Sequence, residues 1–478
     1  MEATMLTVND SGQLVSPNGQ TPQAPPLNPA LSSLLKELSE SEGGLLDRRM
    51  FFDPEIYKVE LERVFARSWS FLCHESQLAK AGDFFSTYIG ADPVVVTRQR
   101  DGSISAVLNS CRHRGMKVCR ADWGNAKAFT CTYHGWSYST DGSLVSVPRE
   151  EYAYYNEIDK SKLGLLRVPQ VQSYKGLVFG CFDPEAPSLV DFLGDMTYYL
   201  DILLDRVDGG TEVISGVHKW KMRGNWKLAA EQFSGDNYHT ISSHISVLLS
   251  EFPPEAADAF VNIDGLEINP AEGHGIGVMY SPTGAPFSAG SSEAILRWRD
   301  ETRQESINRL GKERVEGMSW THANVFPNFS YLHDSSVLRV WMPKSPTEME
   351  AWSWCIVDKK APQEVKNAWR TQAIRHFSPG GTWEQDDGEN WSYCSGAGGQ
   401  EGVVTRLSKL HVEMGVGHER SHPTLPGKVS HTYSEQNQCS LYRRWAEFMA
   451  AESWKDISVP VRTTEVIDRS DMAKAGES

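Results

Sequence analysis

Cys111-Arg-His113 and Cys131-Thr-Tyr-His134, with seventeen residues between them, are the stretch that decides the fold of the N-terminal part of this chain. Each pair contains one thiol and one imidazole, and a glycine lies within two residues of each histidine. Glycines let backbone N–H groups approach a bound group closely. The pattern predicts two loop tips that each give one thiolate and one imidazole to the same metal centre.

This ligand set is the one that a Rieske [2Fe–2S] cluster requires, because two thiolates hold one iron and two imidazoles hold the other. A zinc ion is the alternative, since two Cys and two His also satisfy a tetrahedral site. Zinc fingers usually pair Cys with Cys and His with His, whereas both pairs here are mixed. The sequence therefore favours the cluster, with Cys111, His113, Cys131 and His134 as its ligands.

Composition and charge exclude several classes of function. The 478 residues carry a net charge of −15, which argues against a nucleic-acid partner. Apolar runs such as Pro93-Val-Val-Val96 have the length of a strand, so no membrane span is expected. The start of the chain lacks the pattern of a secretory signal, and its eight cysteines are sparse. We expect a cytoplasmic protein with reduced thiols.

The pattern along the chain predicts an α+β protein of two domains after an N-terminal tail. Residues 1–46 are expected to be a flexible tail with a short helix, because the first 28 are rich in Pro, Ser, Asn and Gln. Residues 47–170 are expected to form the small antiparallel β domain, with a docking helix at 54–68. Residues 171–478 are expected to form an antiparallel sheet flanked by helices. Its helices are predicted at 188–204, 225–242, 362–376, 380–393 and 440–453.

A second group of metal ligands is expected near residue 240. His239 and His244 are five residues apart, so a regular helix would turn them about 140° away from each other. They converge only if the helix ends or bends between them. Two imidazoles and one carboxylate form the facial triad of non-haem Fe(II) oxygenases. A pair of histidines is also common as a structural feature, and the iron interpretation depends on the electron donor upstream.

From about Phe52 onward the chain resembles the large (α) subunits of Rieske ring-hydroxylating dioxygenases, in the branch acting on biphenyl, toluene and naphthalene. The motifs that carry the resemblance are Cys111-Arg-His-Arg-Gly-Met, Tyr133-His-Gly-Trp, Asn225-Trp-Lys, Glu231-Gln-Phe and Glu384-Gln-Asp-Asp-Gly-Glu-Asn-Trp391. It implies that His239, His244 and Asp387 hold a mononuclear Fe(II). Asp386 is then an acid exposed to solvent or behind the ligands, because adjacent helical residues point about 100° apart. Asp236 matches the carboxylate that bridges the iron to a cluster histidine, here His134, of a neighbouring subunit.

The resemblance also implies the reaction and the partners. The product would be a cis-dihydrodiol, made by adding both atoms of O₂ to an aromatic ring. The electrons come from NADH through a separate reductase, usually with a ferredoxin, and the sequence itself lacks the Gly-x-Gly-x-x-Gly dinucleotide motif. A small β subunit in an α₃β₃ assembly is implied as well.

Eight residues match the substrate pocket of the family: Gln232, Phe233, Asn237, Thr240, His322, Leu332, Phe377 and Trp383. The aromatic members suit a flat ring. Asn237 and Thr240 replace the Met and Ala common in the biphenyl branch, so either an aromatic hydrocarbon or an aromatic carboxylate such as phthalate is compatible. The candidates for binding a carboxylate are Arg223, Arg297, Arg299 and Arg303.

Two other classes of protein remain open at this stage. A Rieske electron-transfer protein would hold two irons per chain rather than three. A Rieske monooxygenase or O-demethylase would share both metal sites and differ in its product.

Overall fold

The computed structural model describes residues 7–8, 14–15, 27–40, 44–251, 264–280, 292–318, 320–397 and 401–464. Most of the expected flexible tail lies outside these residues. Within it, strand β1 (Thr7–Val8) pairs with β2 (Leu14–Val15). No helix in the described ranges is long and apolar enough to span a membrane.

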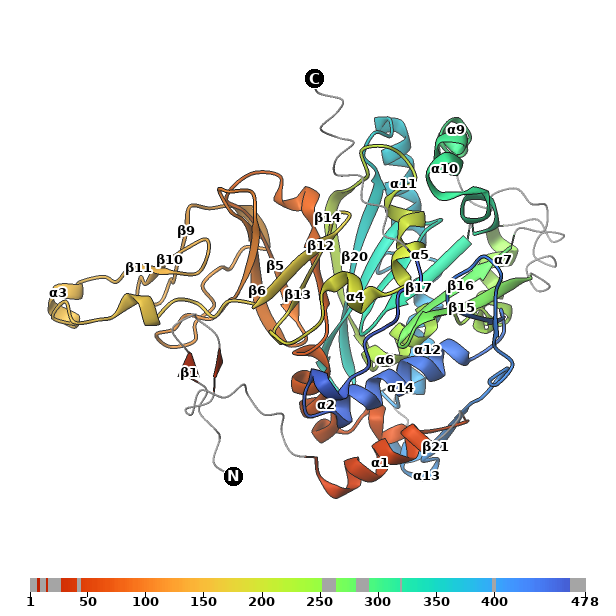
Figure 1. Ribbon diagram of the computed structural model, residues 1–478, viewed down its shortest axis with the longest axis horizontal. Helices are drawn as coiled ribbons and strands as arrows, with labels where there is room; N and C mark the ends of the chain where they lie inside the picture. Colours follow the sequence, from red (N-terminus) through yellow and green to blue (C-terminus); the bar gives the residue numbers. More distant parts are fainter. Residues whose placement is uncertain are drawn as a thin grey trace.

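A nine-stranded antiparallel sheet is the frame of the larger domain (Figure 1). In spatial order its strands are β14 (Thr211–Arg223), β20 (Glu348–Asp358), β19 (Val337–Ser345), β18 (Phe329–Leu332), β17 (Trp320–Val325), β16 (His274–Met279), β15 (Gly265–Ala271), β23 (Lys428–His431) and β22 (Arg420–Ser421). The inner strands β16 to β18 are buried along their whole length, because protein covers both faces of the sheet there. The edge strand β14 is half-exposed.

Helices pack around this sheet. They are α4 (Leu189–Leu193), α5 (Met196–Leu204), α6 (Trp226–Phe233), α7 (Ile245–Glu251), α9 (Glu293–Glu301), α10 (Arg303–Leu310), α11 (Gln363–Phe377), α12 (Glu384–Cys394), α13 (Glu401–Arg406) and α14 (Gln436–Ala450). Helix α6 packs on β16 to β19, α14 packs on β15 and β16, and α11 packs on β20. Short helical turns lie at Lys160–Lys162, Glu313–Gly317 and Trp454–Asp456.

Two of the predicted helices are interrupted. The segment 188–204 is two helices, because Gly194 adopts a φ of +53° between α4 and α5. The segment 225–242 ends as α6 at Phe233 and resumes as a 3₁₀ turn at Tyr238–Ile241. The 3₁₀ turn ends at Ile241 and α7 begins at Ile245, so the helix ends between His239 and His244, as their five-residue spacing requires.

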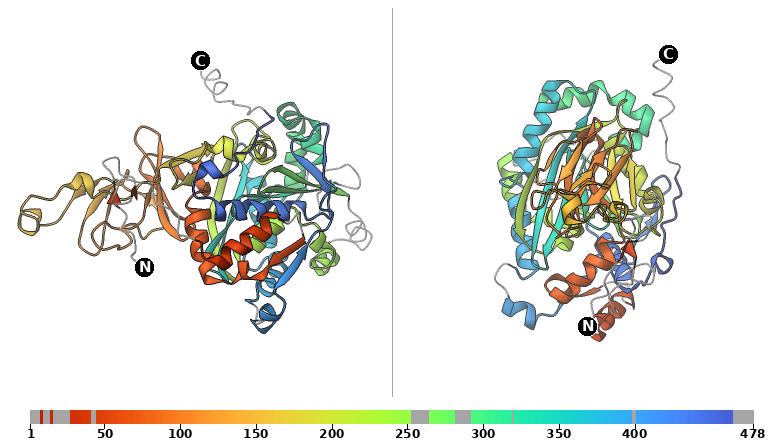
Figure 2. Two further views of the ribbon diagram at one scale, coloured as in Figure 1. Left: turned by 60° about the horizontal axis from the view of Figure 1, so that its bottom comes forward. Right: turned by 90° about the vertical axis from the view of Figure 1, so that its left-hand side faces the viewer.

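The smaller domain projects from one side of the larger one and is built of three small antiparallel sheets (Figures 1 and 2). The strands are β5 (Asp83–Ile89), β6 (Asp92–Arg98), β7 (Ile104–Leu108) and β8 (Trp123–Asn125); β9 (Ala128–Thr130), β10 (Ser137–Ser139) and β11 (Leu144–Ser146); and β4 (Ser70–His74), β12 (Gln170–Tyr174) and β13 (Leu177–Cys181). Helix α3 (Glu150–Ala153) lies at the far tip, and a 3₁₀ turn (Glu75–Leu78) follows β4. A separate apolar core that includes Cys111, Cys131 and Trp136 stabilises the outer part. The α+β fold predicted from the sequence is confirmed.

The N-terminal helices pack on the larger domain. Helix α1 (Pro29–Glu40) buries Leu31, Leu34, Leu35 and Leu38 and contacts α14. Strand β3 (Gly44–Asp47) pairs with β21 (Lys409–Val412) and leads into a 3₁₀ turn at Arg48–Phe51.

The predicted docking helix starts as α2 (Pro54–Glu60), whose N-cap carboxylate on Asp53 accepts a hydrogen bond from the Glu55 N–H at 2.8 Å. It continues as a π-helical turn over Leu61–Phe65. There the buried Arg63 donates to the carbonyls of Met449 and Ala451 at the C-terminal end of α14, each at 2.9 Å.

Candidate metal centres and substrate pocket

The two Cys–His loops have the same backbone hydrogen bonds. The Cys111 N–H donates to the Met116 carbonyl at 2.9 Å, and the Cys131 N–H donates to the Trp136 carbonyl at 2.8 Å. In each loop a glycine N–H then donates back to the cysteine carbonyl, and both glycines have positive φ, +71° and +75°. Repeating one loop geometry brings the two thiols and two imidazoles to one side of the domain.

Two of the four side chains are neighbouring imidazoles. The rings of His113 and His134 lie 4.5 Å apart, and His113 stacks on Trp136 at 5.1 Å. A Rieske cluster holds one of its irons by two imidazoles, so this arrangement fits the cluster expected from the sequence.

Hydrogen bonds and burial around the thiols support the same ligand set. Both cysteines are buried, whereas His134 is exposed. The Tyr138 hydroxyl lies 3.2 Å from Cys111 Sγ and accepts a hydrogen bond from the Arg112 N–H at 3.1 Å. Burial, with the charges of His134 and Arg114, lowers the pKa of His113, which favours the neutral imidazole that a metal ligand needs.

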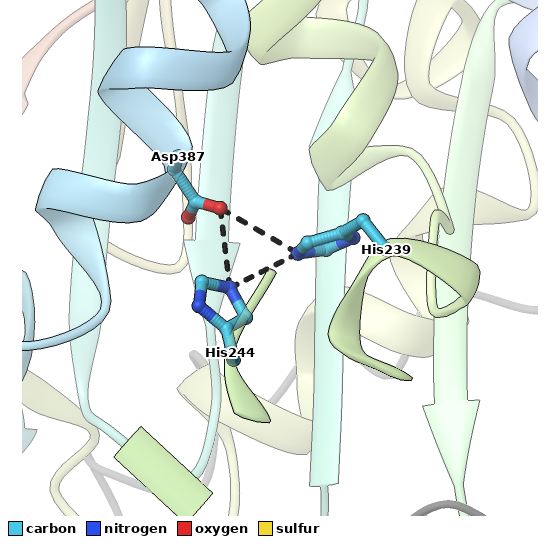
Figure 3. A group of neighbouring side chains, drawn as sticks. All are labelled: His239, His244 and Asp387. Carbon is cyan, nitrogen blue, oxygen red and sulfur yellow. Dashed lines mark hydrogen bonds and ion pairs between the residues drawn. The ribbon is translucent and has the colours of Figure 1, made fainter. Parts of the chain in front are cut away.

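A second group of ligand atoms lies between α12 and the broken helix (Figure 3). Asp387 Oδ1 is 3.1 Å from His244 Nε2 and 3.6 Å from His239 Nε2, and the two Nε2 atoms are 3.1 Å apart. The atoms of His239, His244 and Asp387 lie within 4.8 Å of one another, which is the spacing of ligands around one ion. Asp387 Oδ1 is buried and makes no hydrogen bond, so the triad fits a facial iron site.

Two further carboxylates lie behind the histidines. Asp386 Oδ2 is 3.4 Å from His244 Nδ1, the ring nitrogen on the side away from the triad. Asp236 Oδ2 is 3.3 Å from His239 Nδ1, and its other oxygen accepts a hydrogen bond from the His239 N–H at 3.1 Å. Carboxylates in these positions fix the orientation of the two rings and leave both Nε2 atoms to face Asp387.

The electrostatics of the triad favour a bound cation. Burial opposes a charged His239, but the neighbouring carboxylates of Asp236 and Asp387 outweigh it and raise its pKa to about 9. Burial likewise opposes ionisation of Asp387, but His244 and then His239 keep its pKa below the usual value. A divalent cation would replace the proton in a site whose carboxylates are already ionised.

A pocket opens beside this triad, with a volume of about 420 Å³ that includes its open mouth. All eight residues predicted for the pocket line it, as do the three triad residues and Asp236. Sequence reasoning missed Met279 and Trp320, which also line it. These two are paired neighbours on β16 and β17, and the pairing of strands distant in sequence has no local pattern. The aromatic lining suits a flat ligand.

The polar groups of the pocket are mostly neutral or acidic. Burial lowers the pKa of His322 to about 4, so its imidazole is neutral. Asn237 donates to Thr432 Oγ1 at 2.7 Å, while its own Oδ1 is buried without a partner. No lysine or arginine occurs among the described lining residues, so none of the four candidate arginines is found there.

Comparisons with known proteins agree with this geometry. Residues 68–173 match the Rieske [2Fe-2S] domain family, and residues 211–450 match the catalytic domain of the ring hydroxylating alpha subunits. The biphenyl dioxygenase subunit alpha of Paraburkholderia xenovorans is 41% identical over 435 residues, which are 88% of this chain and 94% of that protein. The benzene 1,2-dioxygenase subunit alpha of Pseudomonas putida is 41% identical over 433 residues, 88% and 95% of the two chains.

Solved structures show the same relationship. Naphthalene 1,2-dioxygenase from Rhodococcus sp., bound to indole, superimposes with a TM-score of 0.78 and 38% identity over 88% of this chain and 98% of that one. A quaternary ammonium Rieske monooxygenase shares the fold alone, with a TM-score of 0.61 and 15% identity over 87% and 98% of the chains.

Fold, paired metal-ligand sets and pocket define an oxygenase that joins a Rieske domain to a mononuclear-iron catalytic domain. The chain belongs to the family of ring-hydroxylating dioxygenase alpha subunits. It is an oxidoreductase of aromatic-compound degradation, and its family works with ferredoxin and reductase partners that deliver electrons from NADH. The resemblance stated from the sequence is thus confirmed.

Proposed function

We propose that this chain dihydroxylates neutral aromatic rings rather than aromatic carboxylates. The observation that carries the proposal is the charge of the pocket: its described lining contains the carboxylates of Asp236 and Asp387 and no cationic side chain of lysine or arginine. A substrate carboxylate would find no ammonium or guanidinium group to pair with there, and the positive charge at the triad is already matched by Asp236 and Asp387, so its desolvation would cost several kcal/mol. A neutral ring that contacts Phe233, Phe377 and Trp383 avoids this cost.

Each group of residues then has a distinct role. His239, His244 and Asp387 hold Fe(II), with Asp386 and Asp236 orienting the two imidazoles. Iron bound there supplies the activation of O₂ for addition of both atoms to one face of the ring. Gln232, held by the Trp391 N–H at 2.8 Å, lies against Asp387 and helps to keep this carboxylate ionised. The aromatic walls orient the ring and exclude water.

The electron path is proposed to cross between two copies of the chain. The Asp236 side chain is 31% exposed although one of its oxygens contacts His239, so its carboxylate is within reach of a second partner. His134 is exposed on the small domain, which projects away from the larger one (Figure 2). Both observations support a hydrogen bond from His134 of one copy to Asp236 of the next, within an α₃β₃ assembly.

Labelled oxygen and a matched pair of substrates test the proposal. The purified protein, with its reductase and ferredoxin, is given biphenyl or biphenyl-4-carboxylate under ¹⁸O₂, and O₂ uptake and products are measured. We expect a dihydrodiol with two labelled oxygens from biphenyl and little coupled turnover of the acid. One labelled oxygen in a monohydroxylated product would indicate a monooxygenase. Faster turnover of the acid would contradict the charge argument.

Metal analysis separates the remaining alternative. An electron-transfer protein would contain about two irons per chain, whereas the proposed oxygenase contains about three. Zinc without acid-labile sulfide would contradict the assignment of the cluster.

A further inference from the structure

A second, smaller cavity lies where α11 packs against β20 and α9 packs against α11. Figure 1 shows these elements. It shares no lining residue with the substrate pocket. Its polar lining consists of Arg206, Thr211, Arg299, His333, Ser336 and Asp358, and Trp369 adds an indole. The space open to the centre of a water-sized sphere is about 10 Å³, which is about the room that one small occupant needs.

Arg299 is a buried charge without a close counter-ion. Its residue is 8% exposed, and it donates from Nη2 to the backbone carbonyl of Asp334 at 3.1 Å. Its Nε is buried and makes no hydrogen bond. The carboxylates of Asp334 and Asp358 attract it, but neither forms an ion pair with it in the described part of the chain. Burial and then Arg206 lower the pKa of Arg299 to about 10, so the side chain stays charged at neutral pH. A buried charge in this state is costly unless a partner compensates it.

Two more polar nitrogens of the lining are buried without partners. Trp369 Nε1 can only donate a hydrogen bond, and it makes none. His333 Nδ1 is also unpaired, and burial together with Arg206 and Arg299 holds the pKa of His333 well below its usual value. With Arg299, three residues of this lining, each more than nine-tenths buried, thus carry a side-chain nitrogen without a partner. Buried polar atoms usually have hydrogen-bond partners, so three unpaired nitrogens in one lining need an explanation.

The charges of the lining residues indicate the sign of the charge that a bound ion would carry. Arg206 and Arg299 are positive, and Asp358 is the one acid in the lining. The Asp358 carboxylate already accepts a hydrogen bond from Trp298 Nε1 at 2.8 Å. Asp334 lies nearby and attracts Arg299, but its carboxyl is not in the lining and burial raises its pKa. The lining therefore carries one excess positive charge beside unpaired N–H donors.

We propose that this cavity binds a single monovalent anion of the size of chloride, held by Arg299 and the Trp369 N–H. A cation is excluded by the two guanidinium groups, and an organic acid is excluded by the size of the cavity. A water molecule would fill the space without balancing the charge. The anion brings both the missing charge and an acceptor for the unpaired donors.

Binding here is coupled to the pocket wall through a short turn. Leu332 lines the substrate pocket and His333 lines the cavity, and the two are consecutive at the end of β18. The turn that follows has a positive φ of +54° at Ser336 and is held by Arg299 through the Asp334 carbonyl. We expect the anion to stabilise this turn and, with it, the fold, whether or not the enzyme turns over.

Halide replacement tests the proposal directly. Holoenzyme crystals soaked in bromide should show an anomalous peak in the cavity beside Arg299 and Trp369. In solution at constant ionic strength, replacing gluconate by chloride should raise the melting temperature of the wild type by about 1–3 °C. Arg299→Gln should lose this rise, and Arg297→Gln is the matched control because Arg297 is exposed on the same helix.

A milder variant keeps the test decisive if Arg299→Gln does not fold. Trp369→Phe removes one N–H donor and no charge, and it should weaken the halide dependence several-fold. Cavities that contain only water in the bromide crystals would overturn the proposal. Equal halide dependence in the wild type, Arg299→Gln and Trp369→Phe would do so as well, since the effect would then arise elsewhere.

Discussion

The two metal-binding regions differ in the burial of one histidine each, whereas His113 and His239 are both half-buried. On the small domain, which projects from the larger one (Figure 1), both cysteines are buried but His134 is exposed. In the larger domain His244 is 3% exposed and its carboxylate partner Asp387 is equally buried. A centre that exchanges electrons with other proteins needs an accessible edge, whereas a centre that activates O₂ beside a substrate has to exclude water. Burial, as much as ligand type, therefore distinguishes a centre that transfers electrons from one that activates O₂.

The largest expected effect is the selective loss of one centre. Asp387→Ala removes the carboxylate of the triad and should abolish mononuclear iron and turnover while the visible spectrum of the cluster stays intact. Asp386→Ala should keep the iron, because Asp386 contacts the outer nitrogen of His244. Iron per chain and the reduced EPR signal check both variants. If Asp386→Ala lost the iron instead, the choice between the two acids would be wrong.

Replacing a ligand of the Rieske cluster should cause the reverse loss, of the cluster but not of the mononuclear iron. Cys111→Ser replaces a thiolate ligand, so the visible absorption and the EPR signal of the cluster should disappear. The triad is built from other elements and should keep its iron. Sulfide and iron analysis would measure this, with Cys355→Ser as a control at a buried thiol far from the loops in sequence. A Cys111→Ser protein that retained its cluster would refute the ligand assignment.

A smaller effect is expected where the two regions communicate. Asp236→Asn keeps the shape of the side chain but exchanges a charged acceptor oxygen for a donor. Both metals should be retained, and re-oxidation of the reduced cluster with substrate and O₂ should slow by about 10–100-fold. Stopped-flow absorbance in a single turnover measures this rate. Re-oxidation at the wild-type rate would remove Asp236 from the path.

The polarity of the pocket should change specificity more modestly. Asn237 and Thr240 line the pocket, and Asn237 Oδ1 has no partner in the protein. Asn237→Met with Thr240→Ala should cost a hydroxylated biphenyl about 1–3 kcal/mol, roughly tenfold or more in kcat/KM. Activity on biphenyl itself should be unchanged or higher. Equal losses on both substrates would assign the two residues to support of the iron site.

The smallest expected effect concerns the cluster potential. The Tyr138 hydroxyl lies 3.2 Å from Cys111 Sγ. Tyr138→Phe removes a hydrogen bond that stabilises the more negative, reduced cluster, so the potential should fall by roughly 20–60 mV, the equivalent of about 0.5–1.5 kcal/mol. Protein-film voltammetry measures the shift. An unchanged potential would show that this hydroxyl does not donate to the sulfur.

Much of this architecture could be predicted from local sequence patterns. The Cys–His spacing predicted the loops of the small domain. The five-residue spacing of His239 and His244 predicted a helix end between them, but not that α6 already ends at Phe233. The family motifs predicted eight pocket residues, and the structure places all eight in the lining of one cavity. These features depend on neighbours in sequence or on motifs that a family shares.

Features that depend on distant packing were not predictable. The docking of the Leu61–Phe65 turn on α14 and the pairing of Met279 with Trp320 join segments far apart in the chain. Arg299 illustrates the limit most clearly. It was a candidate for a substrate carboxylate, but the packing of α9 on α11 places it in a separate cavity. Composition gives no information about which of two neighbouring spaces a long side chain enters.

Because the helix is interrupted between α6 and α7, iron bound there would cross-link separate segments of the chain as well as take part in the reaction. His239 belongs to a 3₁₀ turn and His244 precedes α7, while Asp387 comes from α12, more than a hundred residues away. A metal ion that binds all three residues closes a long loop between them. Its binding free energy then offsets the conformational entropy that is lost when this loop is ordered. Occupancy of the site and rigidity of this joint are therefore linked: a chain that loses its iron also loosens the segment that must recapture it.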